Sequence, residues 1–359
     1  MPNYRPNLWT RGDFEPELWT NTDIGLSLWT APSRVSNLQP SVDGAAVARA
    51  LDKARRDLDL PKDNNPPVRS PPPGKEDSDG HEALDLPARL KLWSPSVTVA
   101  LVVSALVRDI KFSATDATKV ADLAVSNSTA SVTTVAQLRR PTMQQLREEP
   151  ILGLPKTKGR KGDRMAKSDA IMAEATMLDF IMLEALGRDQ ARHRSLYSLL
   201  NVTFEVAAAA SHQFKHLFVV PRPATLWGDI EPLIASPGHA SFPSGHATQA
   251  YAAVEVLQAI LADKAGNKLA TLARSVADNR VIAGVHYDFD SEAGEALGRA
   301  IGAWVVACAT GSKLKLGRFD ASTDDKASIT SINEKPNAHE LLKVLWDLAK
   351  AEITAADKP

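Results

Sequence analysis

Three short blocks of the chain bring together residue types that suit chemistry on a tetrahedral oxyanion. Arginine offers a planar fork for two oxygens, and lysine offers a compact positive charge. A Ser-Gly pair at the start of a helix offers free backbone amides. Histidine can transfer a proton or attack an electrophile near neutral pH, and a carboxylate can orient it. In chain order the blocks read Lys215-x6-Arg222-Pro223, Pro243-Ser244-Gly245-His246 and Arg280-x5-His286-x3-Asp290.

The first block predicts two cations beside the end of a helix. Their spacing of about two helical turns would place Lys215 and Arg222 on one face of a continuous helix. Pro221 opposes this continuity, because proline lacks an amide and disfavours helix at the residue before it. We therefore expect the helix to end before Arg222. Taken alone, the block also fits an ordinary surface helix end.

The second block predicts the start of a helix. Ser244 and Gly245 stand where free amides and the positive end of the helix dipole favour an anion, and glycine lets that anion come close. His246 on the first turn could exchange a proton with the anion. The alternative interpretation is a serine N-cap followed by an incidental histidine.

The third block predicts a histidine on a turn, held by a carboxylate. Gly284 can end the preceding helix and turn the chain. Asp290 lies four residues after His286 and is well spaced to bond one imidazole nitrogen, which would fix the tautomer and free the other nitrogen. Asp288 and Glu292 compete for this role, and a lone histidine after glycine is often only structural.

Together the blocks resemble the signature of the superfamily that joins type 2 phosphatidic acid phosphatases, bacterial nonspecific acid phosphatases and vanadium-dependent haloperoxidases. That signature reads Lys-x6-Arg-Pro, Pro-Ser-Gly-His and Ser-Arg-x5-His-x3-Asp. The chain matches every fixed position except one, where Asn279 replaces the serine. The resemblance extends over residues 204–302. It implies an all-α helical bundle of the acid phosphatase and vanadium haloperoxidase type.

The resemblance implies a role for each site residue. His286 would attack phosphorus in a phosphatase, giving a phosphohistidine, or would bind vanadate in a haloperoxidase. His246 would act as general acid toward the leaving group, or as acid and base for a bound peroxide that Lys215 polarises. Asp290 would orient His286. The oxyanion would be held by Lys215, Arg222, Ser244, Gly245 and Arg280.

Features outside the blocks bear on the branch of the superfamily. His239, seven residues before His246, resembles a histidine that neighbours the vanadate pocket in bromoperoxidase-like enzymes; the alternative is an ordinary loop residue. Phe289 and the long N-terminal extension are also similar to haloperoxidases. Against them, His212 stands where fungal haloperoxidases have a tryptophan. We therefore predict a vanadate-dependent haloperoxidase that oxidises halide with hydrogen peroxide.

Two other functions stay open beside the haloperoxidase. One is a phosphomonoesterase of the acid phosphatase type, which would use the same residues on a phosphate ester and need no cofactor. The other is a catalytically silent scaffold, which the intact site disfavours.

Composition points to a soluble protein that acts on small molecules. The 359 residues carry a formal net charge of −1, so no attraction to nucleic acid follows. The longest apolar run is Val97–Val107, whereas a membrane span needs about 20 residues, so we expect a buried core helix and no span. The N-terminus lacks the apolar core of a signal peptide, which favours the cytoplasm. Cys308, in an apolar run, is expected to be a buried, inert thiol.

The predicted organisation is an N-terminal arm followed by one helical domain. Residues 1–40 form an extended arm with Leu-Trp-Thr repeats, which could lie on the body or on a partner subunit and so give a homo-oligomer. A short helix at 41–60 and a Pro-rich linker at 61–85 precede a helical catalytic domain at 86–355.

Apolar periodicity predicts that most of this domain is helical. Gly294, Gly298 and Gly302 recur every fourth residue within one helix, which predicts close packing against a neighbouring helix. Residues 115–135 are assigned to no element. The predicted helices span residues 96–111, 141–149, 166–186, 189–214, 244–265, 268–283, 291–310 and 337–353.

Overall fold

The described part of the chain is mostly helical, as predicted. The computed structural model describes residues 75–76, 82–83, 85–116, 120–127, 129, 131–148, 161–261, 267–314 and 334–356. The predicted arm at 1–40 and helix at 41–60 lie outside these residues, as does most of the predicted linker at 61–85. The helices are α3 (Leu86–Leu92), α4 (Pro95–Leu106), α5 (Met143–Glu148), α6 (Lys161–Ala166), α7 (Ser168–Thr176), α8 (Leu178–Glu184), α9 (Arg194–Phe218), α10 (Pro223–Leu226), α11 (Gly245–Leu261), α12 (Lys268–Ile282), α13 (Asp288–Thr310) and α14 (Glu340–Ala356). The strands are β1 (Lys75–Glu76), β2 (Glu82–Ala83), β3 (Ile110–Asp116), β4 (Val120–Ser126) and β5 (Val132–Arg139).

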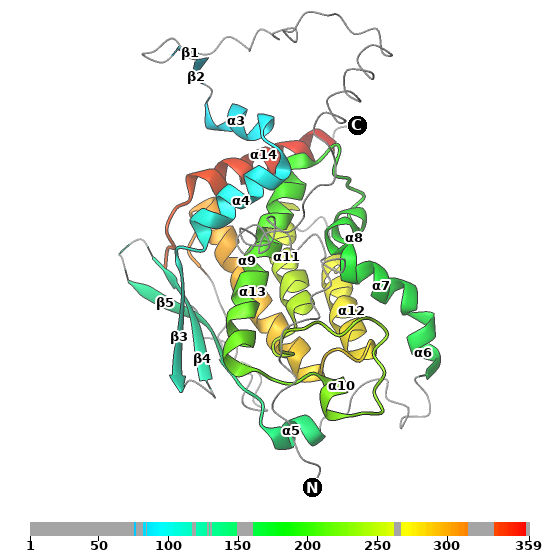
Figure 1. Ribbon diagram of the computed structural model, residues 1–359. Coiled ribbons are helices and arrows are strands. Elements are labelled where there is room, and N and C mark those ends of the chain that lie inside the picture. Colours follow the sequence, from blue (N-terminus) through cyan, green and yellow to red (C-terminus); the bar gives the residue numbers. More distant parts are fainter. Residues whose placement is uncertain are drawn as a thin grey trace, which may run out of the picture.

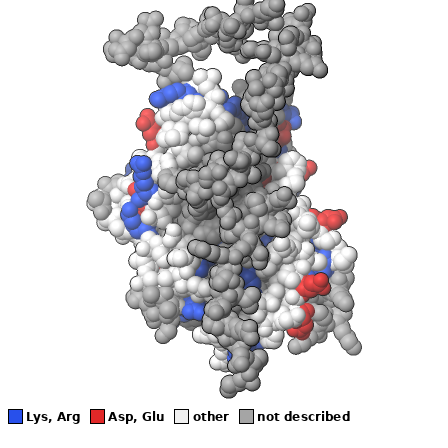
Figure 2. All heavy atoms as spheres, in the orientation of Figure 1, with Lys and Arg blue, Asp and Glu red and all other residues white. Residues whose placement is uncertain are grey.

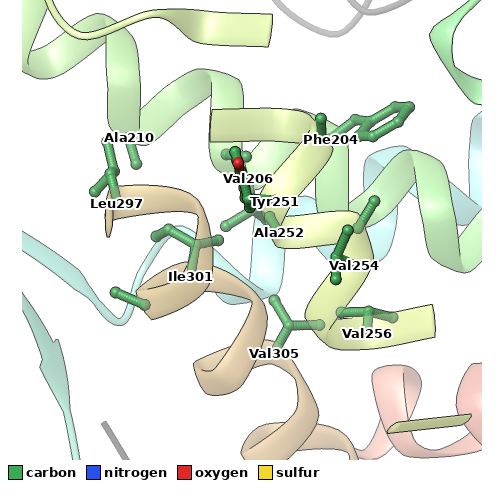
Figure 3. Packing of buried hydrophobic residues seen from close by; sticks show 14 of the residues in the cluster. Phe204, Val206, Ala210, Tyr251, Ala252, Val254, Val256, Leu297, Ile301 and Val305 are labelled. Atoms are coloured by element: carbon green, nitrogen blue, oxygen red, sulfur yellow. The ribbon is translucent and has the colours of Figure 1, made fainter. Parts of the chain in front are cut away.

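Three long helices, α9, α11 and α13, form the centre of the molecule, and α12 and α14 pack beside them (Figure 1). Figure 3 shows side chains from the three central helices meeting in this core, among them Phe204, Tyr251 and Ile301. Burying such a side chain stabilises the fold by about 1.5–3 kcal/mol. Cys308 on α13 is buried, as predicted, and burial raises the pKa of its thiol, which keeps it unreactive.

The glycine row of α13 lies against α11, as predicted. A Cβ added at Gly298 would lie 2.4 Å from the Thr248 carbonyl oxygen, and one at Gly302 would lie 2.6 Å from the Ala252 oxygen. Both distances are far below van der Waals contact, so only glycine allows the two backbones to approach this closely. The row therefore fixes how the start of α13, with Asp290, meets the start of α11.

Replacing Gly298 with alanine is expected to lower the free energy of unfolding by about 1–3 kcal/mol, because the obstacle is backbone that a side-chain rotation cannot move. The measurement is thermal or urea unfolding followed by circular dichroism. Gly228→Ala is the matched control, since nothing lies within 4 Å of the Cβ that it adds. Equal losses in the two variants would contradict the close-packing account.

A three-stranded antiparallel sheet, β3-β4-β5, lies beside the bundle, with β5 against α13 (Figure 1). The sequence prediction missed this sheet, which occupies most of the unassigned residues 115–135. The alternation typical of a half-buried strand fails in β4, because Leu123, Ala124 and Val125 are all buried at a register shift. The small sheet is a local exception to the predicted all-α class.

The predicted helix 96–111 is shorter and more exposed than expected. It ends at Leu106 as α4, and residues 110–116 form β3. One face of α4, with Val102 and Leu106, is buried and packs on α9, whereas Val97 and Leu101 on the other face are exposed. The prediction of a buried core helix is therefore correct for one face only. No helix in the described part of the chain combines the length and apolar character that crossing a membrane requires.

The predicted helix 166–186 is broken at Met177, whose φ and ψ of −135° and 32° end α7 and start α8. The break lets α7 lie against α12 while α8 lies against α9. The predicted helix 189–214 also differs, because Asp189 accepts hydrogen bonds from the Arg192 backbone and side chain in a turn before α9. The helix then begins at Arg194 and continues to Phe218.

Candidate active site

The three sequence blocks meet at the end of the bundle that carries α10, away from α14 (Figure 1). The last turn of α9, the segment 219–244, the start of α11, the end of α12 and the start of α13 all contribute residues. The cations of the blocks are buried within the protein. Figure 2 shows Lys and Arg as well as Asp and Glu on the described surface of the face in view, with Asp and Glu mostly toward its right side. Because Lys215, Arg222 and Arg280 are buried, the positive charge of the site lies under the surface.

The first block does not form one continuous helix. The α9 helix ends at Phe218, and Val219 adopts the left-handed conformation with φ 48°. Pro221 follows, and Arg222 has extended backbone at the N-cap of α10. The prediction that the helix ends before Arg222 is confirmed. Lys215 and Arg222 thus approach the site from different elements.

Arg222 contacts two separate segments of the site through its guanidinium. Its NH1 donates to the Val285 carbonyl oxygen at 2.7 Å and lies 3.1 Å from Nε2 of His286. Its Nε donates to the His239 carbonyl oxygen, and its NH2 lies 3.1 Å from Nδ1 of His239. The guanidinium therefore joins the turn of the third block to the segment that carries His239.

Lys215 is fixed by the same segment. Its Nζ donates to the carbonyl oxygens of Ala240 at 2.9 Å and Ser241 at 2.7 Å. Burial and the charge of Arg222 lower the pKa of this ammonium well below its usual value. The protonated lysine ammonium has three N–H donors, so one is left for an anion. A Cβ at Gly245 would lie 4.0 Å from Lys215 Cε, which places the start of α11 beside the lysine.

His286 is held by Asp290, as predicted. Nδ1 of His286 lies 2.8 Å from Oδ2 of Asp290, which also accepts from the Ser241 hydroxyl and from the Tyr287 backbone N–H. Arg222 can only donate a hydrogen bond, so Nε2 of His286 must accept and the proton lies on Nδ1. Burial, with Arg222 and Lys215, lowers the pKa of His286 well below its usual value, which favours the neutral ring.

The carboxyl of Asp290 is fully buried. Burial raises its pKa to about 6, and the hydrogen bond from Ser241 opposes this rise. Its Oδ2 lies 2.8 Å from Nδ1 of His286, so its ionised form is the one that accepts the imidazole N–H.

The second block begins α11, as predicted. The Ser244 hydroxyl accepts weakly from the Ala247 backbone N–H at 3.4 Å, and the Ser244 N–H donates to the Asp290 carbonyl oxygen at 2.9 Å. His246 lies on the first turn and is partly buried. Burial and then Arg280 lower its pKa to about 3, while a hydrogen bond to the Ala175 carbonyl opposes this.

Arg280 reaches the site from the last turn of α12. Gly284 follows with φ +81°, so the predicted helix end at this glycine is confirmed. NH2 of Arg280 donates to Oε2 of Glu174 at 2.9 Å and to the Ile171 carbonyl oxygen at 2.8 Å. Among the described residues, its Nε and NH1 have no hydrogen-bond partner although they are buried. Free buried guanidinium donors are what an oxyanion site requires.

His239 lies at the edge of the site. Its side chain is exposed, and its ring meets His212 edge-on with 5.1 Å between ring centroids. NH2 of Arg222 contacts His239, and NH1 of the same guanidinium contacts His286, so Arg222 lies between the two histidines. No cluster of three or more His, Cys, Asp or Glu side chains suited to a metal cation occurs among the described residues. The buried cations and the unpartnered donors of Arg280 favour an anion as the ligand.

Sequence reasoning missed two contributors. Ser241 donates to Asp290, and it stands in the segment before the second block without matching any motif position. Glu174 pairs with Arg280 from α7, and its local sequence carries no signal for such a contact. A serine two residues before Pro-Ser-Gly-His could have marked the first, whereas only the fold reveals the second.

Comparison with known proteins gives a family match over the central segment. Residues 196–313 match the PAP2 superfamily, which confirms over this segment the resemblance seen in the three blocks. Among solved structures the chain is similar to the crystal structure of the first transmembrane PAP2 type phosphatidylglycerolphosphate phosphatase from Bacillus subtilis. That match has 20% sequence identity and a TM-score of 0.27, and covers 42% of this chain and 87% of that chain. No curated protein matches the chain. The haloperoxidase branch stays a prediction.

Proposed function

We propose that the chain hydrolyses a small phosphomonoester, with His286 as the nucleophile. The observation that carries this proposal is the state of the His286 ring. Asp290 holds the proton on Nδ1, and Nε2 presents its lone pair toward NH1 of Arg222. If a phosphoryl oxygen accepts from NH1 of Arg222 in place of Nε2, the phosphorus atom lies next to Nε2 of His286. The match of residues 196–313 to the PAP2 superfamily supports the same reaction class.

The first step forms the bond between Nε2 of His286 and phosphorus and breaks the bond from phosphorus to the ester oxygen. His246 gives its proton to the departing oxygen. The low pKa of His246 applies to the protein without an anion, and the negative charge of a bound ester beside Arg280 raises it. Lys215, Arg222 and Arg280 stabilise the charge on the phosphoryl oxygens.

The second step returns the enzyme to its starting state. Neutral His246 takes a proton from a water molecule, whose oxygen attacks phosphorus while the bond to His286 breaks. Inorganic phosphate leaves, and His246 is again protonated for the next ester. Asp290 keeps Nδ1 of His286 protonated throughout, so the ring carries its positive charge only while it is bonded to phosphorus.

The pH dependence of hydrolysis is expected to follow the pair of Asp290 and His286. The pKa of Asp290 is raised to about 6, so the carboxylate that holds Nδ1–H is ionised above this pH and protonated below it. We therefore expect kcat/KM to fall as the pH drops through about 6. Ser241→Ala removes a hydrogen bond that lowers this pKa, so its acid limb should move to higher pH. The ester ionises identically in the assays of wild type and Ser241→Ala. Acid limbs at the same pH in the two proteins would therefore rule out Asp290 as the titrating group.

A vanadate-dependent haloperoxidase is the second candidate, favoured by His239 beside Arg222. The donor set fits vanadate, because the free Nε and NH1 of Arg280 suit any tetrahedral oxyanion and His286 offers one nitrogen ligand. Bound vanadate would supply the activation of hydrogen peroxide toward halide. The residues that would hold it are His286, Arg222, Lys215 and Arg280.

One pair of assays separates the two candidates. The purified protein is tested for hydrolysis of p-nitrophenyl phosphate and, after incubation with vanadate, for oxidation of bromide by hydrogen peroxide. We expect hydrolysis that vanadate inhibits competitively, with no oxidation of bromide. Oxidation of bromide without hydrolysis would overturn the phosphatase in favour of the haloperoxidase, and activity in neither assay would overturn both.

A further inference from the structure

A carboxylate outside the three blocks contacts the site from α7. Oε2 of Glu174 accepts from NH2 of Arg280 at 2.9 Å, and Oε1 accepts from the side-chain amide of Asn279 at 2.8 Å. The Ile171 carbonyl oxygen accepts a second hydrogen bond from the same NH2 at 2.8 Å. The pair is buried, with 1% of the Arg280 side chain and 5% of the Glu174 side chain exposed.

These contacts occupy one nitrogen of the guanidinium and leave the other two free. Nε and NH1 of Arg280 have no partner among the described residues. A guanidinium is planar, so fixing NH2 also fixes the directions in which Nε and NH1 point. Buried donors of this kind normally have an acceptor. Their acceptor is therefore a group that the described residues do not provide.

The last turn of α7 contacts two site residues at once. Glu174 holds Arg280, and the carbonyl of the next residue, Ala175, accepts a hydrogen bond from His246. The carboxyl end of a helix also carries partial negative charge, which suits a neighbouring cation. The turn thus sets the relative positions of an anion-binding cation and of the residue assigned to proton transfer.

We propose that Glu174 is a positioning residue, which holds Arg280 so that Nε and NH1 face the phosphoryl oxygens of the substrate. Asn279, which replaces the serine of the family signature, fixes the second oxygen of the same carboxylate. The proposal rests on the proposed function, because it assigns Arg280 to the phosphate. Asn279 and Glu174 are joined by a hydrogen bond of 2.8 Å.

A competing interpretation predicts the opposite sign. If Glu174 merely neutralised Arg280, its removal would raise the positive potential of the site and strengthen the binding of anions. If Glu174 positions Arg280, its removal frees the guanidinium to turn away, and anion binding weakens. The sign of the change in phosphate affinity therefore distinguishes the two.

The test compares Glu174→Ala and Glu174→Gln by calorimetry with inorganic phosphate and by kcat and KM with p-nitrophenyl phosphate. Glu174→Ala is expected to weaken phosphate binding and kcat/KM by about 10–100-fold, as when a partner that orients a ligand is lost. The Glu174→Gln amide oxygen still accepts from Arg280, so a loss of about fivefold or less is expected. Glu255→Ala, which removes a glutamate from the more exposed ion pair with Arg299, is the control and should match wild type.

The positioning role is overturned if Glu174→Ala binds phosphate as tightly as wild type or more tightly, or if Glu174→Gln loses as much as the alanine variant. If the alanine variant shows no cooperative melting, Glu174→Asp replaces it. That variant keeps the charge but withdraws the carboxylate by one methylene, so about a tenfold loss is expected and an unchanged affinity overturns the proposal. Wild-type protein that neither binds phosphate nor hydrolyses the ester would instead overturn the proposed function itself.

Discussion

Replacing His286 with alanine is expected to lower kcat/KM for p-nitrophenyl phosphate by about 10⁴-fold or more, because the variant has no nitrogen to bond phosphorus. Nitrophenolate is a good leaving group that needs little protonation, so this loss reports on the nucleophile and not on His246. The binding of inorganic phosphate should weaken far less, since the cations that hold the oxygens are still present. Steady-state kinetics and calorimetry measure the two effects separately.

His216→Ala is the matched control for this variant. His216 lies on the last turn of α9, next to Lys215, but its side chain is exposed and it occupies no fixed position of the blocks. We expect near wild-type kinetics for it. A His286→Ala variant that melts like wild type and keeps its turnover would remove His286 from the mechanism.

Replacing Asp290 with asparagine is expected to lower kcat by about 10³–10⁴-fold, as in other sites where an amide reverses the tautomer of a catalytic histidine. The amide nitrogen would donate to Nδ1 of His286 and so place the ring proton on Nε2. Nε2 would then face the N–H groups of Arg222 without a lone pair to attack phosphorus. The size of the loss is read from kcat at saturating ester.

Asp288→Asn provides the control, because Asp288 is the neighbouring carboxylate on the first turn of α13. From the sequence it competes with Asp290 for His286, whereas the structure gives the contact to Asp290 at 2.8 Å. Near wild-type kcat is expected for Asp288→Asn. The reverse pattern, with Asp288→Asn impaired and Asp290→Asn active, would contradict the hydrogen-bond network of the site.

The local geometry of the site could be predicted because the blocks contain residues that end a helix or that are spaced to form a hydrogen bond. Pro221 ends the helix before Arg222, Gly284 ends the helix after Arg280, and the spacing of Asp290 allows it to reach His286. These are short-range effects of single residues on the backbone. They predict which atoms meet within a block, and the resemblance predicts that the blocks meet one another.

Contacts from distant elements could not be predicted in this way. Glu174 lies 106 residues before Arg280 in the chain, on a helix whose pattern shows only a buried face. Its pairing depends on the break at Met177, which no proline or glycine marks. The sheet was missed for a similar reason, since the buried run in β4 hides the period of two. Tertiary packing in both places overrides the local pattern.

The central claim is that His286 carries the phosphoryl group during turnover, and trapping that group tests it most directly. Wild-type protein turning over p-nitrophenyl phosphate is quenched in base, because phosphohistidine is labile to acid, and is then digested and analysed by mass spectrometry. We expect one phosphoryl group on the peptide that contains His286, lost on acid treatment and absent from His286→Ala. Rapid hydrolysis with the group on another residue, or on none, would contradict it.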